Sequence, residues 1–128
     1  MIAINSLGDH GRMNNIVSGF YKISLLRVSD GALLTNATGG DVVVTCSVSS
    51  ETTAVEGKDF VLTNLHDLRI WGDGNRSTVN LNGIVLFDKD KLGAKKMVME
   101  ISSVQTPDFA PEVGISSTGK FASFMIHE

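Results

Sequence analysis

The stretch "DVVVTCSV", residues 41–48, decides the fold class because its apolar residues recur at every second position. In a β-strand this spacing places Val42, Val44, Cys46 and Val48 on one face and the intervening residues on the other. Cys46 is the only cysteine, so it has no disulfide partner within the chain, and its place in this run predicts a buried small hydrophobe. The stretch therefore predicts a strand with one face in a core.

Similar short runs rich in Val, Ile, Thr and Phe recur along the chain, separated by Gly, Asn, Asp and Ser. The expected strands are residues 2–5, 20–28, 41–48, 59–63, 68–71, 77–87, 95–104 and 120–128. Helix formers gather only around residues 88–96, where Gly93 interrupts them. We therefore predict an all-β fold, a single antiparallel two-sheet β-sandwich of immunoglobulin-like type with seven or eight strands. It is expected to fill residues 1–128 as one domain, with residues 1–15 forming an N-terminal strand and loop.

Two of these runs carry apolar residues on both faces, which is unusual for a strand with one face in water. Either a bulge at Gly83 changes the direction of the side chains, or another segment or another chain covers the second face. The second alternative predicts an interface formed by Ile84, Leu86, Phe124 and Ile126.

Composition excludes several classes of partner. The formal net charge is −3 with both signs mixed along the chain, which gives no basic face for nucleic acid. No apolar run approaches the ~18 residues of a membrane span, and the N-terminus lacks a charged leader followed by an apolar core. We expect a protein made in the cytoplasm without a secretory signal, binding neither membrane nor nucleic acid.

The sequence offers little that points to catalysis. The three histidines are widely separated, and no nucleophile has a neighbouring base. We therefore expect no enzyme activity. Trp71, which precedes the turn sequence "GDG", is the one residue singled out as a contact, either as an exposed interface anchor or as a tryptophan at the rim of the core.

The segment "GGDVVVTCSVSSETTAVEGKDFVLTN", residues 39–64, resembles the first half of a Calx-beta domain, a calcium-binding sandwich of exchangers and adhesion proteins. The matching features are a glycine-led strand of alternating valines, a "TA" pair and a glycine–x–aspartate–aromatic turn at Gly57, Asp59 and Phe60. The resemblance extends over residues 16–128. Independently of the family, Gly57 permits a tight turn, Asp59 can accept hydrogen bonds from backbone amides there, and Phe60 can anchor the next strand in the core.

The resemblance implies calcium ligands at Asp59, Asp88, Asp90 and Glu128. The same region carries Lys89, Lys95 and Lys96, where the family has acidic residues. At an effective dielectric constant of ~20, one positive charge about 8 Å from a divalent cation costs roughly 4 kcal/mol before screening. We therefore expect a charged bend with ion pairs and no bound cofactor, and a lysine in the position of the cation.

These observations predict a non-enzymatic structural or interaction protein whose partners are proteins. The format of one free-standing sandwich suggests a bacteriophage virion component, such as a capsid decoration protein that contacts capsid protein or sister copies. Two alternatives stay open: a calcium-dependent binding or adhesion module, and a carbohydrate-binding sandwich that uses Trp71, Asp73 and Asn75.

Overall fold

A computed structural model describes residues 1–6, 10–12, 16–37, 39–57, 59–72, 74–86, 95–107 and 113–127. This part of the chain contains strands and no helix, which confirms the all-β prediction. The strands are β1 (Ile2–Ser6), β2 (His10–Arg12), β3 (Ile16–Leu25), β4 (Val42–Val48), β5 (Phe60–Leu62), β6 (Arg69–Ile70), β7 (Thr78–Val85), β8 (Lys95–Gln105) and β9 (Phe121–His127).

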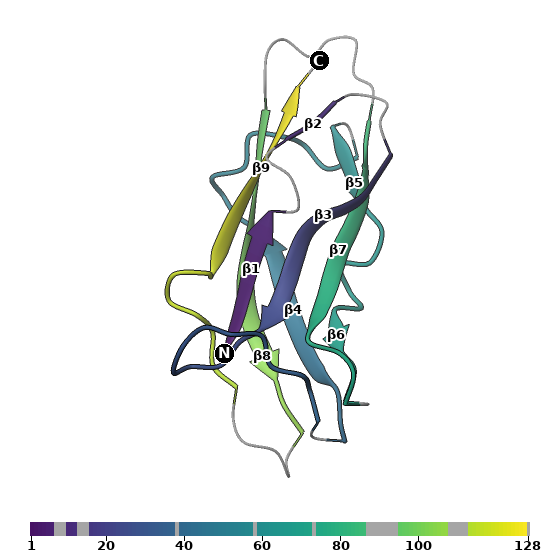
Figure 1. Ribbon diagram of the computed structural model, residues 1–128. Coiled ribbons are helices and arrows are strands. Elements are labelled where there is room, and N and C mark those ends of the chain that lie inside the picture. Colours follow the sequence, from purple (N-terminus) through teal and green to yellow (C-terminus); the bar gives the residue numbers. More distant parts are fainter. Residues whose placement is uncertain are drawn as a thin grey trace.

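The strands form two sheets that face each other along the long axis of the molecule (Figure 1). One sheet has the order β1-β3-β7-β5 and the other the order β2-β9-β8-β4-β6. When β1, β3, β4, β5, β7, β8 and β9 are lettered A to G in chain order, the first sheet has the order A-B-E-D and the second contains the order G-F-C. This is the immunoglobulin arrangement with β2 and β6 added at the two edges of the second sheet, so the predicted sandwich is confirmed.

The strand that the sequence did not predict is β2. It pairs in parallel with β9, whereas the other strand pairs are antiparallel. Because β1 pairs with β3 in the first sheet and β2 with β9 in the second, the N-terminal segment contributes to both sheets. The three residues His-Gly-Arg have no alternating apolar pattern, which explains why periodicity gave no sign of this strand.

The core lies between the sheets and includes Cys46, as predicted. Its aromatic centre joins β3 to β9, where the rings of Phe20 and Phe124 meet edge to face with centroids 4.8 Å apart. Tyr21 lies beside them and donates its hydroxyl hydrogen bond to the carbonyl of Met97, at 2.9 Å. Phe124 is 1% exposed. Its predicted place in an interface is therefore wrong, because its side chain fills the core of its own sheet pair.

One of the two alternatives from the sequence placed a bulge at Gly83, and the structure has a bulge in the opposite strand instead. Val17 pairs with Gly83 and Tyr21 with Leu81, so the extra residues belong to β3. Gly83 is needed for a different reason: a Cβ at this position would overlap the ring of Phe20 and the carbonyl oxygen of Val61.

The tight turn before β5 has the roles that the sequence predicted. Gly57 adopts a positive φ of 88°, and Phe60 is fully buried. Asp59 is also fully buried and accepts a hydrogen bond from the backbone N–H of Val55 at 2.8 Å. One carboxylate oxygen of Asp59 thus accepts a backbone hydrogen bond within the turn, as the sequence predicted.

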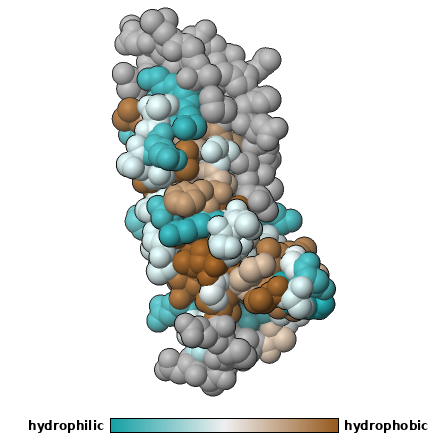
Figure 2. Space-filling view, turned by 90° about the vertical axis from the view of Figure 1, so that its left-hand side faces the viewer, coloured by the Kyte–Doolittle hydropathy of each residue, from teal (hydrophilic) through white to brown (hydrophobic). Residues whose placement is uncertain are grey.

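The outer surface mixes polar and apolar groups. On the flank at the left of Figure 1, apolar side chains gather mainly in the lower half and are interrupted by polar ones (Figure 2). Among the described residues, no helix is long and apolar enough to cross a membrane.

Candidate functional site: a groove beside the free edge of β7

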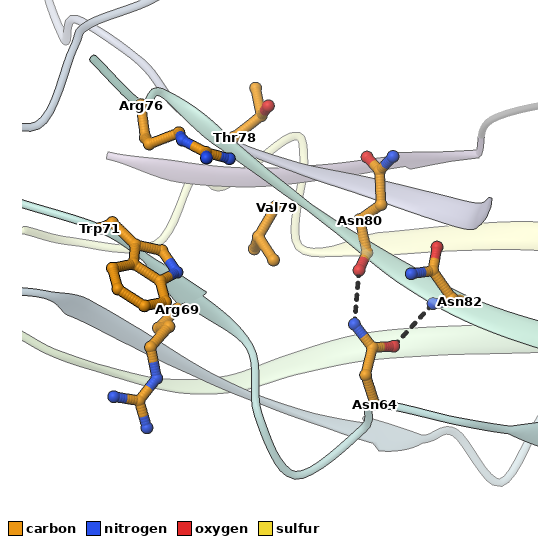
Figure 3. A pocket seen from close by; sticks show the side chains of 8 residues that line it. All are labelled: Asn64, Arg69, Trp71, Arg76, Thr78, Val79, Asn80 and Asn82. Carbon is orange, nitrogen blue, oxygen red and sulfur yellow. Dashed lines mark hydrogen bonds between the residues drawn. The ribbon is translucent and has the colours of Figure 1, made fainter. Parts of the chain in front are cut away.

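A groove of about 280 Å³ runs between the edges of the two sheets, where β6 lies opposite β7. We call it the Trp71 groove. Trp71 and Arg69 form one wall, Asn80 and Asn82 of β7 form the other, and Val79 points into the space between Trp71 and Asn64 (Figure 3). Trp71 is 57% exposed, so the alternative of a tryptophan at the rim of the core does not describe it.

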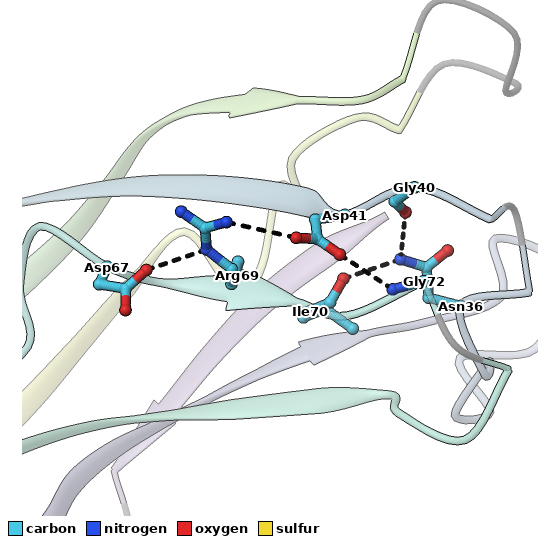
Figure 4. A network of polar contacts seen from close by, with 7 residues as sticks. All are labelled: Asn36, Gly40, Asp41, Asp67, Arg69, Ile70 and Gly72. Carbon is cyan, nitrogen blue, oxygen red and sulfur yellow. Dashed lines mark hydrogen bonds and ion pairs between the residues drawn. The ribbon is translucent and has the colours of Figure 1, made fainter.

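The backbone around Trp71 is fixed on both sides by buried or charged side chains (Figure 4). The amide Nδ2 of Asn36, which is 1% exposed, donates to the carbonyl of Ile70 at 2.8 Å. The N–H of Gly72 donates to Oδ1 of Asp41 at 3.2 Å. A Cβ on Gly72 would overlap the backbone of Gly40, so this close approach requires glycine. The backbone on both sides of Trp71 is therefore held in place by hydrogen bonds.

The guanidinium of Arg69 is held by ion pairs with two carboxylates. Its Nε lies 2.9 Å from Asp67 and its Nη1 lies 3.3 Å from Asp41. Hydrogen bonding and charge from Asp67, and then from Asp41, raise the pKa of this guanidinium. Arg76, in contrast, is exposed and forms no ion pair with a described residue. Among the described residues that line the groove, Arg76 thus carries a positive charge that is not part of an ion pair.

On the side that faces β5, the backbone N–H and C=O groups of β7 have different hydrogen-bond partners along the strand. The strand β5 has three residues, and they pair with Val85, Ile84 and Gly83 of β7. The N–H of Thr63 then donates to the carbonyl of Asn82 at 2.9 Å. Beyond this point the main chain turns away, and among the described residues no strand lies next to β7 on this side.

The side chain of Asn64 replaces the missing strand over one step. Its Oδ1 accepts the N–H of Asn82 at 2.7 Å, and its Nδ2 donates to the carbonyl of Asn80 at 2.7 Å (Figure 3). A primary amide carries the same donor and acceptor pair as a peptide group, which is why asparagine can do this. At the other end, the N–H of Asn36 donates to the carbonyl of Arg76 at 2.7 Å.

Three backbone groups between these two closures have no partner among the described residues. Even-numbered residues of β7 direct their backbone groups to this side, as the bonds at Asn82 and Asn80 show, and odd-numbered residues pair with β3. The three groups are therefore the N–H of Asn80 and the N–H and C=O of Thr78. We call them the open window. It lies on the wall of the Trp71 groove.

The predicted calcium ligands are not brought together in the part of the chain that is described. Asp59 is buried in its turn, and Asp88, Asp90 and Glu128 lie outside the described residues, as does Lys89. Among the described residues, no three His, Cys, Asp or Glu side chains form a group that could hold a metal ion. The calcium site stays a prediction.

The other predicted interface residues have different surroundings. Ile84 is partly exposed on β7, and Leu86 is partly exposed just after it. Ile126 pairs with Lys95, and its side chain lies outside the described residues, as does Asp73.

Burial raises the pKa of the Cys46 thiol to about 12, so this cysteine carries no thiolate near neutral pH.

No protein-family model matches the sequence, and no curated protein matches it. The resemblance to Calx-beta domains therefore rests on the quoted residues and stays a prediction.

Sequence reasoning identified Trp71 and missed the rest of the groove. The roles of Asn64, Asn80 and Asn82 carry no local sequence signal, because they depend on which strands end beside these residues. The one available signal was the length difference between the apolar runs at residues 59–63 and 77–87, which leaves the longer strand unpaired over part of its length.

Proposed function

We propose that this protein is a non-enzymatic interaction module that binds a protein partner through the Trp71 groove. The observation that carries the proposal is an exposed tryptophan whose flanking backbone is held by hydrogen bonds, facing backbone groups of β7 that have no partner among the described residues. Large aromatic side chains dominate many interface energies because they bury much apolar area at a small cost in side-chain entropy.

Rigidity favours binding at this position. A backbone segment that is already held by hydrogen bonds loses less conformational freedom when a partner binds to it. The ion pairs of Arg69 and the bonds of Asn36 and Asp41 hold the wall in place before any partner arrives. The described residues supply no competing arrangement of acid, base and nucleophile in this groove.

Site-specific photo-crosslinking tests the proposal. A benzophenone amino acid replaces Trp71 in one variant and Phe121 in a control, since Phe121 is 50% exposed and lies on β9, at the other side of its sheet from β6. In extracts of the cells that make the protein, we expect a discrete protein adduct from position 71 that excess unlabelled wild type suppresses and excess Trp71→Ala does not. Equal adducts from both positions, or none from position 71, contradict the proposal.

The mass of the adduct separates the kinds of partner. An adduct of two copies of this chain indicates self-association, and a heavier or lighter adduct indicates another protein. A capsid protein in the adduct would support the narrower proposal of a virion decoration protein, which no described contact tests.

Carbohydrate binding is the second candidate, and one observation favours it. Exposed polar side chains, Asn80 and Arg76, lie in the same groove as the indole of Trp71. Sugars combine apolar C–H faces with hydroxyls, which suits an aromatic ring beside amide and guanidinium groups. Glycan-array binding that is lost in Trp71→Ala and kept in Phe121→Ala would favour this candidate over a protein partner.

A further inference from the structure

We propose that the Trp71 groove receives an extended polypeptide segment, which adds to β7 as a short strand at the open window. This inference rests on the proposed function and names the class of partner. Extended peptides bind to sheet edges elsewhere by completing the main-chain hydrogen bonds that the edge leaves open.

The open window has the donor and acceptor pattern of a strand edge. The C=O of Thr78 and the N–H of Asn80 lie on the same side of β7 and are two residues apart, as are the bonds that Asn64 makes one step further along. One residue of an added strand can donate its N–H to the C=O of Thr78. A peptide carbonyl on the same strand can accept the N–H of Asn80 or of Thr78.

The length of the added strand is limited at both ends. Asn64 closes the edge at the carbonyl of Asn80, and the N–H of Asn36 closes it at the carbonyl of Arg76. The free stretch accommodates about three residues of an extended chain, given a rise of about 3.3 Å per residue. Main-chain bonds alone therefore give weak binding, and the side chains of the segment must contribute.

The walls of the groove indicate which side chains fit. Val79 and the indole of Trp71 lie on either side of the space, so an apolar side chain placed between them would be buried. Arg76 is exposed at the same site without an ion pair to a described residue. An acidic side chain beside the apolar one would meet this charge. We therefore expect a segment that contains an apolar and an acidic residue.

The shape of the site favours a single extended segment over the edge of another folded sheet. Trp71 and Arg69 lie across the groove from the open window, and together with Asn64 they flank the free edge (Figure 3). A second copy of this chain would have to bring a strand with its neighbouring layer into this space. A segment without such a layer needs room only for its own main chain and side chains.

Peptides selected from a displayed library of random nonapeptides provide the probe. Wild-type protein serves as bait, and Thr78→Pro serves as the counter-selection. Proline removes the N–H of Thr78 from the window while the ladder bonds of Val79 and Leu81 with β3 remain. Binding of a selected, fluorescein-labelled peptide is measured by anisotropy. Trp71 is the only tryptophan, so its emission reports contact in the groove directly.

We expect selected peptides to change the Trp71 emission and to lose roughly tenfold or more in affinity for Trp71→Ala and Thr78→Pro, but not for Phe121→Ala. Each backbone nitrogen of the peptide is methylated in turn. Methylation of the nitrogen that donates to Thr78 should abolish binding. Methylation of either neighbouring nitrogen should lower the affinity at most a few-fold, because alternate N–H groups point away from the edge. The amides of Thr78 and Asn80 should become protected from hydrogen exchange in the wild-type complex, a result that does not depend on any variant folding.

Binding that is indifferent to every N-methyl position, or that leaves the Thr78 and Asn80 amides unprotected, overturns strand addition. So does a library that yields no peptide preferring wild type over Thr78→Pro. If the adduct from position 71 persists in either case, the proposed protein-binding function stands and only this mode fails. If the adduct is absent as well, both fail.

Discussion

Two interior strands of the sandwich, β8 and β7, extend beyond the end of a neighbouring strand. The two differ in how the backbone groups of the extended part are hydrogen-bonded. β8 continues to Lys95 after its neighbour β4 has ended at Val48. β7 starts at Thr78, although its neighbour β5 reaches it only from Gly83 onward. Each strand therefore has a stretch of backbone whose ladder bonds must be supplied by something other than a strand.

Along β8, the segment after β4 supplies those bonds. The N–H of Ser49 donates to the carbonyl of Val98, and the hydroxyl of Thr52 both accepts from the N–H of Val98 at 2.9 Å and donates to its carbonyl at 3.1 Å. Thr53 bonds to Lys96 in the same way, with its hydroxyl accepting the N–H at 2.9 Å. Threonine hydroxyls thus accept the N–H groups of this edge at Val98 and Lys96, and backbone N–H groups of residues 49–54 donate to its carbonyls.

Along β7, Asn64 completes one step and the open window remains. The difference shows that this sequence can close an unpaired strand with side chains and does so at β8. At β7 the unclosed stretch coincides with the exposed tryptophan. An edge that is left open beside an exposed aromatic residue is a feature of binding sites, because elsewhere sheet edges are protected against unwanted pairing.

Gly83→Ala should have the largest effect on this comparison. The added Cβ would overlap Phe20 and the carbonyl of Val61, so it would press β5 away from the half of β7 that is now paired. We expect the free energy of unfolding to fall by about 3 kcal/mol, at the upper end for overpacking. Urea denaturation measures the change. Gly114→Ala is the matched control, because a Cβ there meets nothing within 4 Å and should change stability little.

Thr52→Val tests the closed edge with a change of almost the same shape. Val98 is 3% exposed, so its N–H loses its hydrogen-bond partner in a place that water does not reach freely, whereas its C=O keeps the N–H of Ser49. We expect a loss of about 2 kcal/mol in unfolding free energy. Thr52→Ser keeps the hydroxyl and should retain most of the stability. If the valine and serine variants unfold at the same urea concentration, the hydroxyl does not close β8.

The sequence was sufficient to predict the sandwich because strand periodicity depends on local alternation. The eight expected runs correspond to β1 and β3 to β9, within a few residues at their ends. Periodicity could not decide which of two apolar faces is the inner one. In β9 the pattern allowed either, and the fold buries Phe124 while Phe121 is 50% exposed.

The site could be predicted only at Trp71, because the other features depend on strand ends that meet across the fold. Asn64 and Asn80 are 16 positions apart in the chain, and nothing local marks one as the partner of the other. The same holds for the bulge. Gly83 was one of two alternatives that the sequence offered, and the extra residues of the bulge lie in β3, across from β7.

Asn64→Ala should increase the difference between the two edges, because it opens β7 further. The N–H of Asn82 and the carbonyl of Asn80 lose their partner, but water in the groove can replace it. We therefore expect a smaller loss than at Thr52, about 1 kcal/mol in unfolding free energy. The amide of Asn82 should exchange faster in this variant. A loss as large as that of Thr52→Val would show that the groove edge is as inaccessible to water as the edge of β8.

Hydrogen exchange in the unmodified protein tests the comparison without changing stability. The amides of Val79 and Leu81 belong to residues that pair with Ile23 and Tyr21 of β3, so they exchange only when the sheet opens. The amides of Thr78 and Asn80 belong to the open window and meet water in the groove. We expect these two to exchange faster by a factor on the order of a hundred or more, which two-dimensional NMR in D2O measures. The amides of Lys96 and Val98 on β8, both bonded to threonine hydroxyls, should instead resemble Val79. Equal protection along all of β7 would mean that something closes its edge in solution, and the open window would then be no place for an added strand.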